Sequence, residues 1–146
     1  MMNRRHFIRI TASATAAASL MSFPFIVRGA GKQVVIIGGG AGGATAARYI
    51  RELDDSIEVT LIEPKEHYHT CFMSNEVLSG ERSIESIQFN YQGLTKHGVK
   101  VIPSRATAID PEAKKVTLEN GDSVSYERLI VSPGIDFKWD AIEGYD

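Results

Sequence analysis

The stretch that most constrains this chain runs from Val34 to Gly43 and reads VVIIGGGAGG. Its first four residues are apolar and β-branched without alternation, which is typical of a strand covered on both faces in a parallel sheet. The glycines predict a turn, and the residues behind it predict a helix with a small, apolar face toward the strand. That face comprises Ala44, Ala46, Ala47, Tyr49 and Ile50. This order predicts a Rossmann-like α/β fold.

The glycines of the turn have the spacing G-x-G-x-x-G, at Gly38, Gly40 and Gly43. In this pattern the first glycine permits the tight turn and the second lets a pyrophosphate approach backbone N–H groups with no Cβ in the way. The third allows the helix to pack closely on the strand, and the helix directs the positive end of its dipole at the phosphates. We predict a dinucleotide site; the alternative is an Ala/Gly-rich turn without a ligand.

A second marker of such a site lies twenty residues after Gly43. The run Ile57 to Ile62 predicts another strand, which ends on Glu63 and is stopped by Pro64. An acidic residue at this position accepts hydrogen bonds from the two ribose hydroxyls of a dinucleotide and repels a 2′-phosphate. The two markers together favour FAD or NAD over NADP.

The first 29 residues differ in composition from the rest, because they hold four arginines and no acidic residue. They carry the pair Arg4-Arg5, then Phe7-Ile8, and then a mildly apolar segment rich in Ala, Ser and Thr. This pattern predicts a twin-arginine export signal over residues 1–29, and hence a periplasmic protein. The apolar segment is too short for a stable membrane span. The alternative is a basic tail without a targeting role.

Beyond the leader, residues 30–146 carry 12 basic residues against 18 acidic ones, which argues against nucleic acid as a partner. The whole chain of 146 residues, 43% of them hydrophobic, fits one domain of ordinary size. It has a single cysteine, so it can form no internal disulfide, and it has no Cys-x-x-Cys-His motif for a c-type haem. No metal site is predicted.

The segment from Lys65 to Glu81 is rich in His, aromatic and polar residues and predicts a loop. In a Rossmann unit this loop leaves the carboxyl end of the second strand, where ligands lie. Its Cys71 is either a small buried apolar side chain or a functional thiol. The nearby His67 and His69 either favour the thiolate electrostatically or are solvated loop residues.

Further along, residues Ser83 to His97 predict a short amphipathic helix that ends at Gly98, with Val99 to Ile102 as the next strand. The apolar stripe of this helix is expected in the core. It comprises Ile84, Ile87, Tyr91 and Leu94.

The segment Thr107 to Tyr126 predicts an inserted β-meander. Its Asn120-Gly121 pair predicts a hairpin turn, because both residues can take a positive φ. The strand Arg128 to Val131 then returns to the sheet and runs into the turn Ser132-Pro133-Gly134. An ordinary Pro-Gly turn remains an alternative for this last tripeptide.

Three runs carry a resemblance to a known family: VVIIGGGAGGATAARYI, VTLIEP and YHTCFMSNEVLSGERSIESI. Across residues 30–146 the chain resembles the amino-terminal part of the flavoprotein subunit of flavocytochrome c sulfide dehydrogenase. In that family the cysteine of the T-C-(aromatic)-x-S-N-E-V motif holds FAD covalently through its 8α methyl group, which implies this role for Cys71. The resemblance also implies main-chain contact of Ala106 with the adenine. It places Ser132-Pro133-Gly134 near the FAD, although Ser-Pro departs from the Ala-Thr of the wider superfamily.

The resemblance implies an FAD-dependent oxidation of sulfide to sulfur or polysulfide, with electrons passing to a c-type cytochrome subunit. It also implies a second nucleotide-type domain, an interface domain and a redox disulfide, none of which lies in these residues. We therefore expect a partial FAD-binding domain that by itself does not oxidise sulfide, and the catalytic cysteines cannot be named. The alternatives are a sulfide:quinone oxidoreductase, a type II NADH dehydrogenase, or a binding module without turnover. The predicted cofactor-binding residues are Gly38, Gly40, Ala41, Gly42, Gly43, Glu63, Pro64, Cys71, Ala106, Ser132, Pro133 and Gly134.

Overall fold

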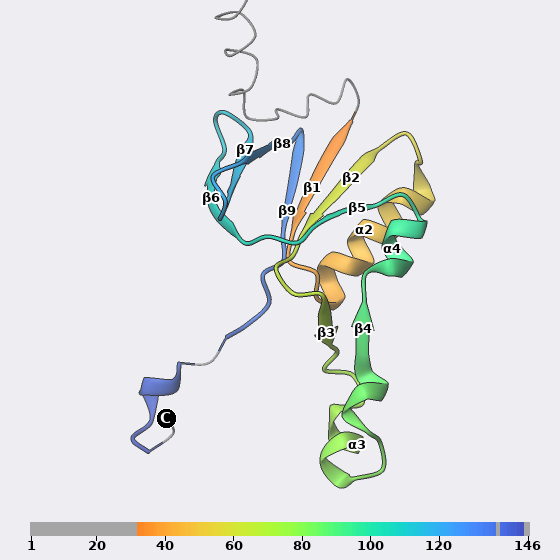
Figure 1. Cartoon of the computed structure of the whole chain (residues 1–146), viewed down its shortest axis with the longest axis vertical. Coiled ribbons are helices and arrows are strands. Elements are labelled where there is room, and N and C mark those ends of the chain that lie inside the picture. Colours follow the sequence, from red (N-terminus) through yellow and green to blue (C-terminus); the bar gives the residue numbers. More distant parts are fainter. Residues whose placement is uncertain (1–31, 137, 145–146) are drawn as a thin grey trace, which may run out of the picture.

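The computed structural model describes residues 32–136 and 138–144, so the predicted export signal lies outside the described residues. The described chain has an α/β fold with a four-stranded sheet in the order β5-β2-β1-β9 (Figure 1). All neighbouring strands in this sheet are parallel, as the sequence predicted. The strands are β1 (Gln33–Ile37), β2 (Glu58–Ile62), β5 (Lys100–Ile102) and β9 (Arg128–Val131).

The carboxyl ends of these strands meet at one edge of the sheet. In the register, Ile37 at the end of β1 lies opposite Ile62 of β2 and Val131 of β9, and Ile62 lies opposite Ile102 of β5. The residues that follow the four strands therefore emerge beside one another. In an open parallel sheet this edge is where ligands bind.

The two faces of the sheet are covered by different layers. Helices α2 (Ala41–Leu53) and α4 (Gln92–Lys96) cover one face, and the antiparallel meander of β6 (Ala106–Asp110), β7 (Lys115–Leu118) and β8 (Ser123–Ser125) covers the other. Neighbouring side chains of β1 point to opposite faces, because the side-chain period of a strand is two. Val35 accordingly packs with the meander and Ile36 with the helices, and both are fully buried. This explains why β1 is apolar without alternation.

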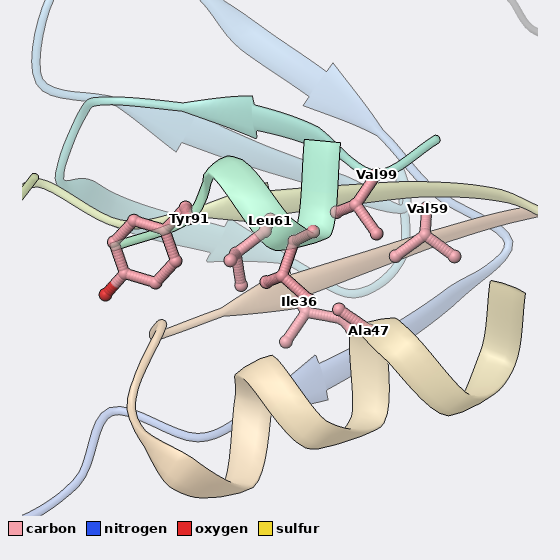
Figure 2. Packing of buried hydrophobic residues seen from close by; sticks show 7 residues of the cluster. Ile36, Ala47, Val59, Leu61, Tyr91 and Val99 are labelled. Atoms are coloured by element: carbon pink, nitrogen blue, oxygen red, sulfur yellow. The ribbon is translucent and has the colours of Figure 1, made fainter. Parts of the chain in front are cut away.

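The core on the helix side joins β1 and β2 to both helices (Figure 2). It comprises Ile36, Ala47, Val59, Leu61, Tyr91, Leu94 and Val99. Within α2 the buried stripe includes Gly43 and Ala47. The prediction that Tyr49 shares this stripe is wrong, since its side chain is 58% exposed. Two positions after Ala47 is about 200° around a helix, so Tyr49 points away from the sheet.

The predicted meander is confirmed, and so is its Asn-Gly hairpin, but the turn differs in one detail. Of the two central residues only Gly121 has a positive φ, of 87°. The side chain of Asn120 instead accepts a hydrogen bond from the backbone N–H of Asp122, at 3.0 Å. Asparagine therefore acts here through its side chain, as in an Asx turn.

Between β2 and α4 the chain forms an arm that extends away from the sheet (Figure 1). The arm contains the hairpin of β3 (His67–His69) and β4 (Gln88–Asn90), the helix α3 (Ser74–Ser79) and the 3-10 helix η2 (Ile84–Ile87). The predictions of a loop over residues 65–81 and of one helix over 83–97 are therefore wrong. A second 3-10 helix, η3 (Trp139–Ala141), lies near the end of the described chain.

The apolar residues from 84 to 94 have helical spacing, but they belong to a segment that runs through three elements, η2, β4 and α4. Pairing of Tyr68 with Phe89 draws residues 88–90 into a strand. The side chain of Asn90 then accepts a hydrogen bond from the N–H of Gln92, at 3.1 Å, where α4 begins. The predicted end of this helix at Gly98 is confirmed by its φ of 79°. No helix in residues 32–136 and 138–144 is long and apolar enough to cross a bilayer.

Candidate functional site

The glycine turn, Glu63 and the turn at Ser132 come together at the carboxyl edge of the sheet. Gly38, directly after β1, donates its N–H to the carbonyl oxygen of Ile62 at 2.9 Å. Ser132, directly after β9, donates its N–H to the carbonyl oxygen of Ile37 at 2.8 Å. Three of the predicted parts of the site thus meet in the structure, although they are far apart in the sequence.

The three glycines of the motif differ in what surrounds them. Gly38 has a φ of +97°, and a Cβ there would collide with the carbonyl oxygen of Ser132. A Cβ at Gly43 would collide with the carbonyl oxygen of Gly38 and lie 3.3 Å from a methyl group of Ile36. A Cβ at Gly40 would meet nothing within 4 Å. Packing therefore requires the outer glycines, whereas Gly40 leaves open space at the start of α2.

The carboxylate of Glu63 is fixed beside the glycine turn. Its Oε2 accepts a hydrogen bond from the N–H of Gly39 at 2.7 Å, and its Oε1 accepts one from the N–H of Lys65 at 2.9 Å. The side chain is half-buried. A carboxylate has about four lone-pair sites, so each oxygen can accept a further hydrogen bond. The carboxylate is thus held in place by the protein and is still able to bind hydroxyl groups.

A cavity of about 520 Å³ lies at the ends of β2 and β5, and its lining includes Pro64, the residue after Glu63. It is lined by Pro64, Ile102, Pro103, Ser104, Glu119 and Asn120. Ala106, the predicted adenine contact, begins β6 two residues beyond Ser104 and packs against the apolar cluster of the meander. Its side chain therefore contacts the protein core. The contact of its main chain with an adenine stays a prediction.

Cys71 lies between β3 and α3 in the chain. These two elements belong to the arm that extends away from the sheet (Figure 1). Cys71 is exposed, so its interpretation as a buried apolar side chain is wrong. A local turn surrounds it: the N–H of Phe72 is hydrogen-bonded to the hydroxyl of Thr70 at 3.2 Å, and the N–H of Ser74 to the carbonyl of Cys71 at 3.3 Å. The thiol is therefore accessible on a short, ordered turn.

The arm that carries this thiol also exposes apolar and imidazole side chains. His67 and His69 are both exposed on β3, as expected of solvated residues, and their influence on the thiol stays a prediction. The exposed apolar side chains of the arm are Phe72, Met73, Leu78, Ile84 and Phe89. Apolar surface of this kind beside a thiol suits contact with a flat, largely apolar ring system.

One part of the site was missed by the sequence analysis, namely an aromatic link between the arm and the glycine turn. The hydroxyl of Tyr91 donates a hydrogen bond to the carbonyl oxygen of Gly39 at 3.1 Å. Its ring stacks on that of Tyr68 in the arm, with centroids 5.9 Å apart. Burial, with a smaller effect of the Glu63 carboxylate, raises the pKa of the Tyr91 phenol. No local pattern indicated this link, because Tyr91 and Gly39 are far apart in the sequence.

By sequence and by structure, the chain is similar to a sulfide:quinone enzyme of Aquifex aeolicus. The chain is 32% identical over 104 residues to the sulfide-quinone reductase of Aquifex aeolicus, covering 70% of this chain and 24% of that protein. The crystal structure of the sulfide:quinone oxidoreductase from this bacterium superimposes with a TM-score of 0.67 at 31% identity, covering 72% of this chain and 25% of that one. The chain thus spans about a quarter of the length of these relatives.

A shorter stretch gives a higher identity. Over 46 residues the chain is 59% identical to the sulfide dehydrogenase [flavocytochrome c] flavoprotein chain of Chlorobaculum thiosulfatiphilum, covering 32% of this chain and 96% of that sequence. Residues 32–145 match the family described as pyridine nucleotide-disulphide oxidoreductase. Because this match covers all the described residues, the chain belongs to the pyridine nucleotide-disulphide oxidoreductase family.

Proposed function

We propose that this chain binds FAD at the carboxyl edge of its sheet and serves in the oxidation of sulfide. The observation that carries the proposal is the pairing of Glu63 with the glycine turn. The turn leaves open space at Gly40, where a phosphate needs to approach the backbone, and holds a carboxylate beside it through the N–H of Gly39. These are the groups that an adenine dinucleotide requires, so the residues present fit this cofactor.

Different residues would bind different parts of the cofactor. The free N–H groups at the start of α2, from Ala41 to Gly43, would hold the pyrophosphate with the help of the helix dipole. Glu63 would accept hydrogen bonds from the ribose, and the cavity that includes Pro64 would take the adenine. Ser132 to Gly134 would border the other side of the glycine turn, from the end of β9.

Changing Glu63 tests this assignment. We expect Glu63→Ala to weaken FAD binding by about 1.5 to 3 kcal/mol for each charge-assisted hydrogen bond lost. Where FAD becomes attached covalently, the defect should appear as slow or incomplete incorporation. Incorporation is followed by flavin absorbance after mixing apoprotein with FAD. Glu112→Ala, which changes an exposed glutamate of the meander, is the matched control. An unchanged rate in Glu63→Ala would count against the assignment.

We propose that Cys71 attaches the flavin ring of FAD covalently, through its 8α methyl group. Formation of the thioether replaces one hydrogen of the thiol and one of the 8α methyl group, and the flavin accepts the two electrons released. Bound FAD supplies the ability to take an electron pair from sulfide and to release electrons one at a time. A covalent bond would retain the cofactor after export to the periplasm, where lost FAD could not be replaced. The acidic body of the chain is consistent with a basic electron-accepting partner.

We propose a c-type cytochrome subunit as that electron acceptor. The 59% identity to a flavocytochrome c flavoprotein chain supports it. A quinone acceptor is the second candidate, because of the 32% identity to a sulfide-quinone reductase over a longer stretch. Each sulfide oxidised to sulfur would release two electrons, which reduce two haems or one quinone.

The test compares the two acceptors in the whole protein purified from its host, because residues 30–146 by themselves are not expected to oxidise sulfide. Rates of sulfide-dependent reduction are measured with cytochrome c and with a water-soluble quinone, each against free FAD at the same concentration. We expect turnover with cytochrome c and only slow reaction with the quinone. The reverse preference would assign the quinone function, and no turnover with either acceptor would overturn sulfide oxidation.

A further inference from the structure

The middle glycine of the Gly38-Gly39-Gly40 run is not part of the G-x-G-x-x-G spacing, yet the structure demands a glycine there. A Cβ at Gly39 would lie 2.5 Å from the hydroxyl oxygen of Tyr91 and 2.7 Å from two of its ring carbons. Real Cβ atoms do not approach other atoms so closely. Gly39 is therefore explained by a neighbouring side chain, whereas Gly40 is explained by space for a ligand.

The peptide groups around Gly39 are held from two directions. The N–H of Gly39 is donated to Glu63 at 2.7 Å, and its carbonyl oxygen accepts the Tyr91 hydroxyl at 3.1 Å. Both Gly39 and Tyr91 are buried, so water cannot readily replace the bond between them. A buried carbonyl that loses its donor keeps an unsatisfied acceptor, which makes the arrangement costly to disturb.

The ring of Tyr91 is itself fixed. It packs in the core cluster with Ile36 and Leu61 (Figure 2), and it stacks on Tyr68 at an interplanar angle of 21°. Tyr68 belongs to β3 at the base of the arm and also contacts Phe89 of β4, with ring centroids 5.8 Å apart. The glycine turn is thus braced against the sheet core and against the arm that carries Cys71.

We propose that Tyr91 is a positioning residue of the nucleotide site, which fixes the path of the glycine turn and, through Gly39, the place of the Glu63 carboxylate. The proposal rests on the proposed binding of FAD. Tyr91 does not need to touch the cofactor for this role, because it acts through the Gly39 peptide. Since burial raises the pKa of its phenol, the hydroxyl remains a donor throughout the neutral range.

The first test removes only the hydroxyl. The full chain carries Cys71→Ser so that FAD binding stays reversible, and the dissociation constant of FAD is measured by fluorescence. We expect Tyr91→Phe to bind FAD about five- to tenfold more weakly, the effect of one lost hydrogen bond. The control is Tyr126→Phe, which removes a hydroxyl that donates to the carbonyl of Asp110 at 3.5 Å, in the meander. It should leave the affinity unchanged.

The second test asks whether the ring of Tyr91 sets the path of the turn at position 39. Gly39→Ala should weaken FAD binding by more than tenfold, on the order of the loss from overpacking, and the double variant Gly39→Ala/Tyr91→Leu should recover part of it because the ring no longer blocks the Cβ. Tyr91→Phe separates positioning from core filling, because it keeps the ring: a side chain that only fills the core predicts an unchanged affinity in that variant. No recovery in the double variant, or an unchanged affinity in Tyr91→Phe, would overturn the inference. A Cys71→Ser parent that does not bind FAD would instead overturn the proposed function, and the inference with it.

Discussion

Flavin that survives denaturation should vanish from the protein when Cys71 is replaced by serine. The chain contains a single cysteine, so no second thiol can form the bond. A serine hydroxyl is a far weaker nucleophile than a thiol, because the thiolate forms much more readily. Cys71 is exposed and lies on a turn, so the substitution should leave the fold unchanged. We therefore expect Cys71→Ser to lose all covalently bound flavin and to keep its fold.

The measurement is flavin fluorescence in a denaturing gel after acid precipitation of protein from the native host. Ser79→Ala is the matched control, because Ser79 is an exposed hydroxyl residue on α3 of the same arm. The control should fluoresce like the unchanged protein. Fluorescence that persists in Cys71→Ser would show that another residue holds the flavin, or that the signal is not covalent.

The second large effect is expected at Gly38. An alanine there would have to adopt a φ near +97°, and its Cβ would collide with the backbone of Ser132. The strained backbone costs about 1–2 kcal/mol and the overpacking about 1–3 kcal/mol, so Gly38→Ala should lower the free energy of unfolding by about 2–5 kcal/mol. Urea denaturation followed by circular dichroism measures this change.

Gly40→Ala supplies the contrasting control for Gly38→Ala. Its Cβ would meet no protein atom within 4 Å and its φ of −67° suits any residue, so the free energy of unfolding should change by less than about 1 kcal/mol. The affinity for FAD should nevertheless fall, because the methyl group occupies the space proposed for the pyrophosphate. Equal destabilisation by both substitutions, or full FAD affinity in Gly40→Ala, would contradict the roles assigned to these glycines.

Much of the fold was predictable because its signals are local. The run Val34 to Ile37 is apolar at every position, which a strand buried on both faces requires, and it forms β1. Residues 128–131 were assigned to a returning strand and form β9 with those bounds. The Asn120-Gly121 pair and the alternation around it identified the meander. In each case neighbouring residues carry enough information to define the element.

The arm was not predictable in the same way, because it depends on contacts between distant residues. Strands β3 and β4 are three residues each, too short to show a clear period, and each is stable only against the other. The spacing from Ile84 to Leu94 imitates a helix although a strand interrupts it. A short apolar pattern cannot distinguish these possibilities without knowledge of the partner strand.

The same difference between local patterns and contacts of distant residues applies to the candidate site. Its glycines and Glu63 follow a spacing that encodes their roles, and the structure brings them together. The bond from Tyr91 to Gly39 joins residues 52 positions apart, and no local spacing announces it. The position of Cys71 relative to the turn depends on the whole arm. The motif therefore predicted which residues lie together at the edge of the sheet, but it did not predict the contacts that hold them in place.

The central claim is that one FAD extends from the glycine turn to Cys71. Trypsin should release residues 66–82, between Lys65 and Arg82, as one peptide that contains this cysteine. Mass spectrometry of that peptide from the protein of the native host should show the mass of FAD less two hydrogens, and phosphodiesterase should then remove AMP from it. An unmodified peptide from protein that has been handled without reductant would contradict the claim.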